Sequence, residues 1–424
     1  MSKNKKKNRI PASVQEAQLR NHYLDRVQKL CTYFGEPTII SELNLLERQL
    51  IFCMRGTAFK LKPADGVKLQ KDDYFHFQEY INETFKQRFV KFLTPCDLQL
   101  SIEDYYQVFL PFQSRLESIK DNEFSKAKEF KQNLARLANL EIDEEQLNQE
   151  FIMVLNRIST LLNFFTLNYY WLEFKPKIFS INHLNTENIL EIHSAEPETK
   201  MVVKNKIPRQ TYRVGWANAR RGMFWVTMNL SDFRKDNRSM DTQLNVYIQM
   251  HALDRLFERL DCLEYYEITN SMVASIMEPV ITKLPKGKFL IEYSLLKSKL
   301  GYFVVEIIKD IVLIDTFLFL TNSGTPEGNK LKQLTGLSKY DTAYFQINNL
   351  EAFVYSDIMW NTELVEIFTN VGCSSIFEIA KRIKNREIEE YEIQSKSAVI
   401  LKYLNLNKEY KRSLEECDYK SLAS

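Results

Sequence analysis

Apolar and polar positions alternate with two different periods along this chain. From about residue 12 to residue 170, aliphatic and aromatic side chains return every three or four positions, which is the spacing of one helical face. This pattern predicts helices over residues 13–34, 72–93, 101–140 and 142–174. Pro111 falls inside the third helix and predicts a kink or a break there.

Beyond residue 170 the apolar runs become short, are rich in β-branched or aromatic residues, and are separated by polar residues. Such runs are typical of strands. They lie at residues 177–184, 189–196, 200–207, 211–218 and 222–230. We expect a small sheet or barrel in this part of the chain.

A third pattern occupies residues 241–325. A strand at 244–250 leads into two short helices, and three strand-like runs follow at 288–296, 302–310 and 311–321. The dipeptide Lys309–Asp310 fits a tight turn between the last two strands. The order β–α–α–β–β–β predicts two helices beside an antiparallel meander.

The fold class that follows is α+β, with helical periodicity returning in the C-terminal segment. We expect five parts: a basic disordered tail (1–11), a helical domain (12–170), a basic β-rich module (171–240), a two-helix-plus-meander domain (241–325) and a helical C-terminal segment (326–424). The alternative for the lysine-rich tail is a contact with nucleic acid.

Composition, together with the lack of certain motifs, limits the classes of protein that we expect. Hydrophobic residues make up 45% of the 424 and charged residues 26%, as in ordinary globular proteins. No secretory signal and no apolar run of membrane-spanning length is present, so we expect a cytoplasmic protein without a membrane partner. The six cysteines lack zinc-ligand spacing and no glycine-rich phosphate loop is found, so we expect no metal and no cofactor. We expect His183 and His193 to be structural.

Residues 250–261, MHALDRLFERLD, contain one of the five histidines in the chain. At 3.6 residues per turn, Leu253, Leu256, Phe257 and Leu260 form one apolar face. The other face carries His251, Arg255, Glu258 and Arg259. Such a helix is either an ordinary surface helix or one wall of an active site.

The pairs His251-Ala252 and Glu258-Arg259, with the meander behind them, resemble small bacterial toxin ribonucleases of the RelE and BrnT type, which have the barnase–EndoU–colicin–RelE fold. The resemblance covers about 80 of the 424 residues. It implies a metal-independent endoribonuclease activity, and it fits a protein of bacterial or mobile-element character.

The resemblance implies roles for the polar face of the helix. RNA cleavage by the 2′-hydroxyl needs a base, an acid and positive charge near the phosphate. His251 would be the base or the acid, Arg255 and Arg259 would hold phosphate oxygens, and Glu258 would orient an arginine or act as the second acid or base. The residues considered from the sheet are Lys297, Lys299, Tyr302 and Thr316.

Residues 200–238 are strongly basic, with ten cations and only two acids. The cations are Lys200, Lys204, Lys206, Arg209, Arg213, Arg220, Arg221, Arg234, Lys235 and Arg238. Aromatic residues are interleaved with them at Tyr212, Trp216, Phe224, Trp225 and Phe233. Cations with aromatic rings suit single-stranded nucleic acid, because cations attract phosphates and rings stack on bases. The alternative is that the rings point into a β-sheet core.

The residues predicted to bind nucleic acid are Lys204, Lys206, Arg209, Arg213, Trp216, Arg220 and Arg221. We therefore expect a protein that interacts with RNA or another nucleic acid and carries a ribonuclease-like domain. The alternatives are a non-catalytic scaffold that binds RNA, DNA or protein, and an assembly protein of a mobile element with a protein partner on its N-terminal helices.

Overall fold

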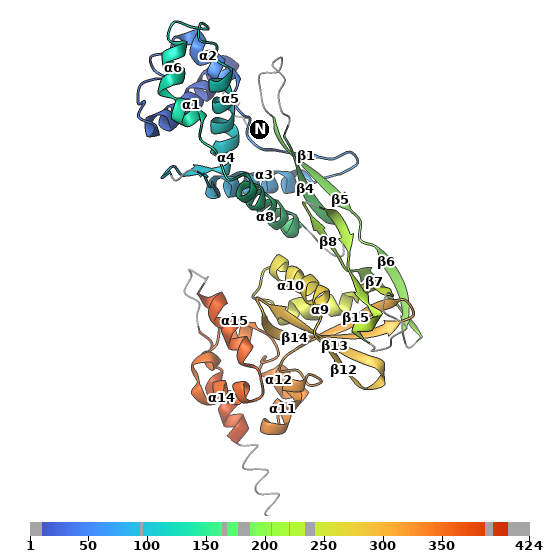
Figure 1. The fold of residues 1–424 in the computed structure, drawn as a ribbon. Coiled ribbons are helices and arrows are strands. Elements are labelled where there is room, and N and C mark those ends of the chain that lie inside the picture. The colour runs from blue at the N-terminus through green and yellow to red at the C-terminus, as the bar shows by residue number, and fades with distance from the viewer. Residues whose placement is uncertain are drawn as a thin grey trace, which may run out of the picture. The chain divides into compact units, whose positions relative to one another are not determined.

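The computed structural model describes residues 11–93, 96–162, 168–176, 187–204, 206–219, 221–233, 242–385 and 393–405. Residues 1–10 of the expected tail, the strand at 177–184 with His183, and Arg220 lie outside the described residues. The fold class is α+β, as the sequence predicts (Figure 1). The chain divides into two compact units: unit 1 is 1–162, 170–194 and 217–222, and unit 2 is 163–169, 195–216 and 223–424.

Unit 1 is mainly helical. Its helical elements are α1 (Ala12–Tyr33), α2 (Leu45–Cys53), α3 (Lys71–Gln87), α4 (Ile102–Asp104), the π-helical turn η1 (Tyr105–Phe109), α5 (Leu110–Ser118), α6 (Ala127–Asn133), α7 (Ala135–Ala138) and α8 (Glu144–Leu162). The backbone stays helical from Ile102 to Ser118, and Pro111 comes directly after the π-helical turn η1. The structure therefore has a π-helical irregularity beside Pro111, not an end of the helix.

Unit 1 also contains strands. Four of them begin within the expected helical region: β1 (Lys60–Pro63), β2 (Phe89–Val90), β3 (Leu100–Ser101) and β4 (Tyr169–Pro176). The fifth, β5 (Asn188–Ala195), lies where a strand was predicted at 189–196. The order in the three-stranded sheet is β1-β5-β4. The prediction that a helix continues to residue 174 is wrong, because β4 begins at Tyr169. The aromatic run of β4 favours a strand, with Leu172 and Phe174 turned to the core.

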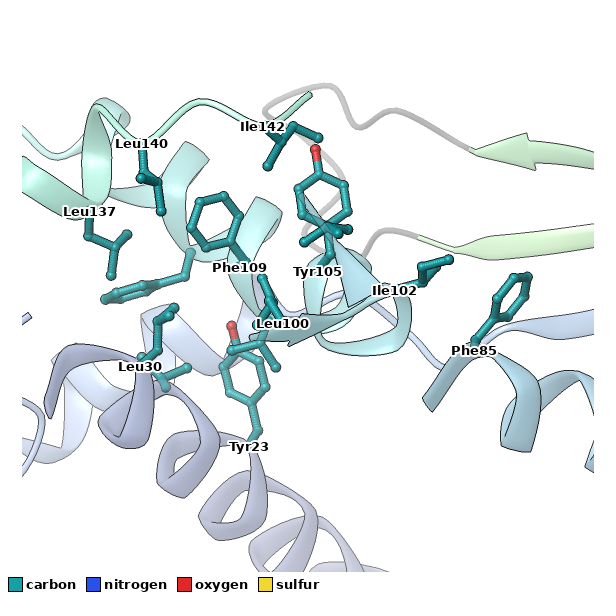
Figure 2. Packing of buried hydrophobic residues seen from close by; sticks show 14 of the residues in the cluster. Tyr23, Leu30, Phe85, Leu100, Ile102, Tyr105, Phe109, Leu137, Leu140 and Ile142 are labelled. Carbon is teal, nitrogen blue, oxygen red and sulfur yellow. The ribbon is translucent and has the colours of Figure 1, made fainter. Parts of the chain in front are cut away.

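One hydrophobic core holds unit 1 together. Figure 2 shows part of it, with Phe109 close to Leu137 and Leu140 and with Tyr23 and Leu30 contributed by α1. Phe59, Phe85, Phe109 and Phe112 are at most 2% exposed. Phe85 and Phe151 stack with their ring centroids 5.0 Å apart, so α3 and α8 are joined by aromatic contacts.

Unit 2 is built on an eight-stranded sheet with the order β12-β13-β14-β15-β11-β7-β6, and β10 also pairs with β11. The strands are β6 (Thr199–Lys204), β7 (Ile207–Arg213), β10 (Thr227–Asn229), β11 (Gln243–Gln249), β12 (Ile281–Lys283), β13 (Lys288–Leu295), β14 (Ser298–Ile308) and β15 (Ile311–Phe319). A separate pair, β8 (Gly215–Asn218) and β9 (Gly222–Trp225), contains the boundary between the two units.

The predicted antiparallel meander is confirmed in β13, β14 and β15, with a turn at Lys309–Asp310. Strand β11 pairs parallel to β15 and antiparallel to β7. The sheet therefore crosses the expected boundary at residue 240 and joins the basic strands β6 and β7 to the meander. One strand of this sheet was not expected: β12 follows α10 and pairs with β13.

The helical elements of unit 2 are α9 (Met250–Arg259), α10 (Tyr265–Met277), α11 (Pro326–Thr335), α12 (Lys339–Tyr344), α13 (Glu351–Val354), α14 (Thr362–Asn370) and α15 (Ser374–Lys384), with short 3₁₀ turns η2 (Leu230–Asp232), η3 (Pro285–Gly287) and η4 (Asp357–Trp360). Helices α9 and α10 cover one face of the sheet (Figure 1). No helix among the described residues is long and apolar enough to cross a membrane.

Candidate functional site

Helix α9 has the two faces that its sequence predicts. Ala252, Leu253 and Leu256 are buried, and the helix contacts β15 and β11. On the other face the Arg255 guanidinium donates a hydrogen bond to Glu258. Arg259 Nη2 lies 3.6 Å from the second carboxylate oxygen of Glu258. The structure thus brings three of the four predicted catalytic residues together, in a row where Glu258 neutralises part of the arginine charge.

His251 lies at the start of α9 and is exposed. Its side chain makes no hydrogen bond or ion pair with any described residue. Gln249 is the N-cap residue, and no side chain caps this helix. No hydrogen bond or ion pair therefore joins His251 to the Arg255–Glu258–Arg259 row among the described residues.

Two titratable groups at or just beyond the C-terminal end of α9, Arg259 and Asp261, have shifted pKa values. Burial lowers the pKa of Arg259, although Glu258 opposes this change. Burial, together with the charge and hydrogen bond of Glu351, raises the pKa of Asp261 to about 6. Asp261 is thus a carboxyl group that changes charge near neutral pH, two residues beyond the predicted site.

The sheet residues considered for the same site lie on the opposite face from α9. On the face toward the helices, Tyr293 donates to the Ile268 carbonyl of α10 over 3.2 Å. Neighbouring side chains along a strand point to opposite faces. Tyr293 pairs with Gly301 of β14 and shares its face, so the next residue, Tyr302, points to the opposite face. The Tyr302 hydroxyl donates to Glu327 of α11 over 3.0 Å.

Two further sheet residues, Lys299 and Thr316, are also directed away from α9, like Tyr302. Lys299 Nζ contacts the Tyr302 hydroxyl at 2.9 Å and Glu327 at 2.7 Å. Thr316 is the register partner of Val304, which lies on the Tyr302 face because it is two positions along the strand. Lys297 lies exposed in the turn between β13 and β14. The structure does not bring Lys299, Tyr302 or Thr316 to α9.

Two of the cations predicted to bind nucleic acid, Lys204 and Arg213, instead form ion pairs with carboxylates of the same unit. Lys204 forms ion pairs with Asp315 and, at 2.7 Å, with Glu306. Burial alone would lower the pKa of Lys204, but the hydrogen bonds to these two carboxylates raise it. Arg213 contacts Glu198 at 2.6 Å and also donates to Asn245. Both cations hold strands together.

Lys206 and Arg209 differ from this pair. Both are exposed on the hairpin formed by β6 and β7, and neither has a carboxylate partner among the described residues. Arg209 Nη1 donates to the neutral amide of Gln249 over 3.1 Å. Exposed apolar side chains lie beside them, with Met201 at 60%, Val203 at 67% and Ile207 at 55% exposure.

Two of the aromatic residues of this segment, Phe233 and Trp225, pack against other rings. Phe233 is buried and meets Phe289 with ring centroids 5.0 Å apart. Trp225 contacts Tyr169 edge to face, and the Arg213 guanidinium lies 5.2 Å from its ring centre. Phe233 and Trp225 therefore pack against neighbouring rings, as expected if the aromatic residues of this segment belong to the core of the sheet.

Trp216 and Arg221 complete the predicted set. Trp216 is half-buried on β8 and belongs to unit 2, whereas Arg221 is exposed and belongs to unit 1. The predicted residues thus fall into two units of the chain. The part that forms one local surface is the β6–β7 hairpin with Lys206 and Arg209.

Sequence reasoning missed one group of residues that could hold a metal ion. The ligand atoms of Glu173, Glu191 and His193 all lie within 4.8 Å of one another. The signal in the sequence is an acid two positions after Trp171 and an acid two positions before His193. Each half is short, and only the pairing of β4 with β5 joins them.

Comparisons of this chain with protein-family models, with curated proteins and with solved structures found no match.

Proposed function

We propose that unit 2 binds single-stranded nucleic acid through the β6–β7 hairpin, without cleaving it. The observation that carries the proposal is that Lys206 and Arg209 are exposed there without a carboxylate partner among the described residues. Asp315 and Glu306, the two acids that contact the turn end of the hairpin, pair with Lys204. Positive charge on this hairpin is therefore available to phosphates.

The hairpin surface also favours unpaired bases over a duplex. Met201 and Val203 present exposed apolar side chains on one face of the hairpin, and Ile207 presents one on the face of Arg209. Unpaired bases expose apolar faces that can lie against such side chains, whereas a duplex hides them in its stack. A strand whose phosphates contact the cations can thus place its bases on the same hairpin.

The ribonuclease activity inferred from the resemblance stays a prediction. A carboxyl with a pKa of about 6 at Asp261 supports acid–base chemistry near α9. Against it, Lys299, Tyr302 and Thr316 lie on the other face of the sheet, so a cation from the sheet does not join His251. Binding without cleavage needs none of these residues to converge.

The test uses the full-length protein and labelled single-stranded RNA, single-stranded DNA and duplex in EDTA. Fluorescence anisotropy is recorded at about 50 and about 200 mM salt. We expect single strands to bind best, with weaker binding at the higher salt, and we expect Lys206→Glu, Arg209→Glu to weaken binding roughly ten- to a hundredfold. Unchanged affinity in this double variant would overturn the proposal.

The matched control is Lys297→Glu. Lys206 and Lys297 both lie in turns with positive φ, at 66° and 67°, so the backbone strain of the two substitutions is the same. We expect Lys297→Glu to bind like the wild type. The same samples are run on a gel, and RNA fragments that disappear in His251→Ala, Arg255→Ala would establish the ribonuclease instead.

A further inference from the structure

Five polar or aromatic side chains share one face of the sheet in unit 1. Strand periodicity places Trp171, Glu173 and Lys175 on one side of β4, and Glu191 and His193 on one side of β5. The side chains between them face the core, where Leu172, Leu190 and Ile192 are 0% exposed. This apolar face fixes the strands, so the opposite face holds its side chains in a defined arrangement.

The two carboxylates and the imidazole converge. His193 Nε2 lies 3.4 Å from Glu173 Oε2 and 3.6 Å from Glu191 Oε2. Ligands at about 2.1 Å from a tetrahedral ion lie about 3.4 Å from one another. The distances from the imidazole to each carboxylate therefore match the spacing of ligands around a metal ion, and all three ligand atoms lie within 4.8 Å of one another.

His193 is held so that Nε2 points at the carboxylates. Its ring stacks on Trp171 with centroids 5.3 Å apart and planes 12° from parallel. Gly222 packs on the Trp171 ring, and a Cβ there would lie 3.6 Å from it. His193 Nε2 is buried and has no hydrogen-bond partner among the described residues, although both carboxylates lie nearby. A buried nitrogen without a partner costs free energy that a bound ion would recover.

Lys175 supplies a positive charge to the same carboxylates. It pairs with Glu191 and lies 3.6 Å from Glu173. The side chain of Lys175 is 57% exposed and carries a flexible stem, so it can turn into solvent at small cost. A divalent ion that enters between the carboxylates would displace this ammonium.

We propose that Glu173, Glu191 and His193 bind a divalent transition-metal ion, and that Lys175 neutralises the two carboxylates when no ion is bound. One imidazole and two carboxylates suit Zn²⁺, Mn²⁺ or Fe²⁺ better than Mg²⁺ or Ca²⁺, which prefer oxygen ligands alone. Three protein ligands leave a position for water, as in metal sites that act on substrates. This site lies in unit 1 and is independent of the function proposed for unit 2.

The first test titrates Zn²⁺ by calorimetry into EDTA-treated, dialysed full-length protein. We expect saturable binding in the wild type, and at least a tenfold loss of affinity in His193→Ala and in Glu191→Gln. The matched control is His76→Ala, because His76 is an exposed histidine on α3 of the same unit. Absence of Zn²⁺ binding to the wild type, or equal binding by His193→Ala, would overturn the proposal.

Lys175→Met separates a metal site from a simple ion-pair cluster. Because it removes the competing ammonium and leaves every ligand in place, we expect it to bind Zn²⁺ more tightly than the wild type. If Lys175→Met weakens binding, the ammonium does not compete and the proposal fails. This variant also keeps the test decisive if a ligand variant does not fold.

Co²⁺ provides an optical readout of the same site. Trp171 lies against the His193 ring, so a paramagnetic ion there should quench its fluorescence. We expect Co²⁺ to quench the wild type, excess Zn²⁺ to reverse the quenching, and Trp171→Phe to lose the Co²⁺-dependent part of the signal. Quenching that persists unchanged in Trp171→Phe would place the ion elsewhere.

Discussion

Lys204 on β6 and Asp315 on β15, 111 residues apart in the chain, form an ion pair across the sheet of unit 2. Strands β7 and β11 lie between them in the strand order, so β6 must curl over the sheet for the two charges to meet. Asp315 is only 8% exposed, and it also accepts from Gln249 over 2.8 Å and lies 3.4 Å from Lys288. This contact fixes the turn end of the hairpin that carries Lys206 and Arg209.

Asp315→Asn should therefore lower the free energy of unfolding by about 1–3 kcal/mol, because a half-buried Lys204 loses a charged partner. Urea denaturation measures this change. Asp310→Asn is the control, since Asp310 is 72% exposed and 3.6 Å from Lys200. Exposed pairs contribute about 0–1 kcal/mol, so the control should change little. Equal effects of the two substitutions would contradict the role given to Asp315.

Stability should fall as the pH rises through the titration of Asp261. The pKa of this carboxyl is about 6 in the folded protein and about 3.9 in an unfolded chain. The folded state therefore holds the proton more tightly, and it loses this advantage as the pH rises from about 4 to about 6. Asp261→Asn should flatten the decline in melting temperature over that window. A wild-type slope in the variant would show that Asp261 keeps an ordinary pKa.

His251→Ala should change the free energy of unfolding by less than about 0.5 kcal/mol, because an exposed side chain without a partner among the described residues contributes little. The nucleic-acid affinity should also be unchanged, since α9 is not part of the β6–β7 hairpin. Thermal melts and anisotropy on the same preparation measure both. A large loss of affinity would move the binding surface to α9.

Gly301→Ala should destabilise unit 2 by roughly 2 kcal/mol or more, because overpacking forces strands apart. A Cβ at this position of β14 would lie 2.3 Å from the Leu318 carbonyl oxygen. Gly287→Ala offers a comparison: φ there is +73°, but nothing lies within 4 Å of the added atom. Backbone strain alone should cost about 1 kcal/mol. Equal losses in urea denaturation would argue against tight packing at Gly301.

The sequence predicts those parts of the fold that depend on local periodicity. The meander β13–β15 and helix α9 follow from alternation and from a 3.6-residue period, so both are confirmed. The insertion of β11 between β15 and β7 was not predicted, because parallel pairing joins segments that are distant in sequence. Strand β4 was predicted as helix, because its aromatic residues also fit helical spacing.

The candidate sites show the same limit. The pairing of Arg255 with Glu258 is a contact within one helical turn, so helical spacing alone places the two side chains together. The partners of Lys204 lie on β14 and β15, more than 100 residues away, and its basic neighbourhood gave no sign of them. Glu173 and His193 come together only after two strands pair, so neither short motif identified the metal-ligand group.

The most direct test of the proposed function is the salt dependence of single-stranded RNA binding by the wild type and by Lys206→Glu, Arg209→Glu. For single strands, each phosphate contact contributes about −0.7 to the slope of log affinity against log salt. If Lys206 and Arg209 contact phosphates, the double variant should have a slope shallower by about 1.4, while Lys297→Glu keeps the wild-type slope. Equal slopes in all three proteins would contradict binding of nucleic acid by this hairpin.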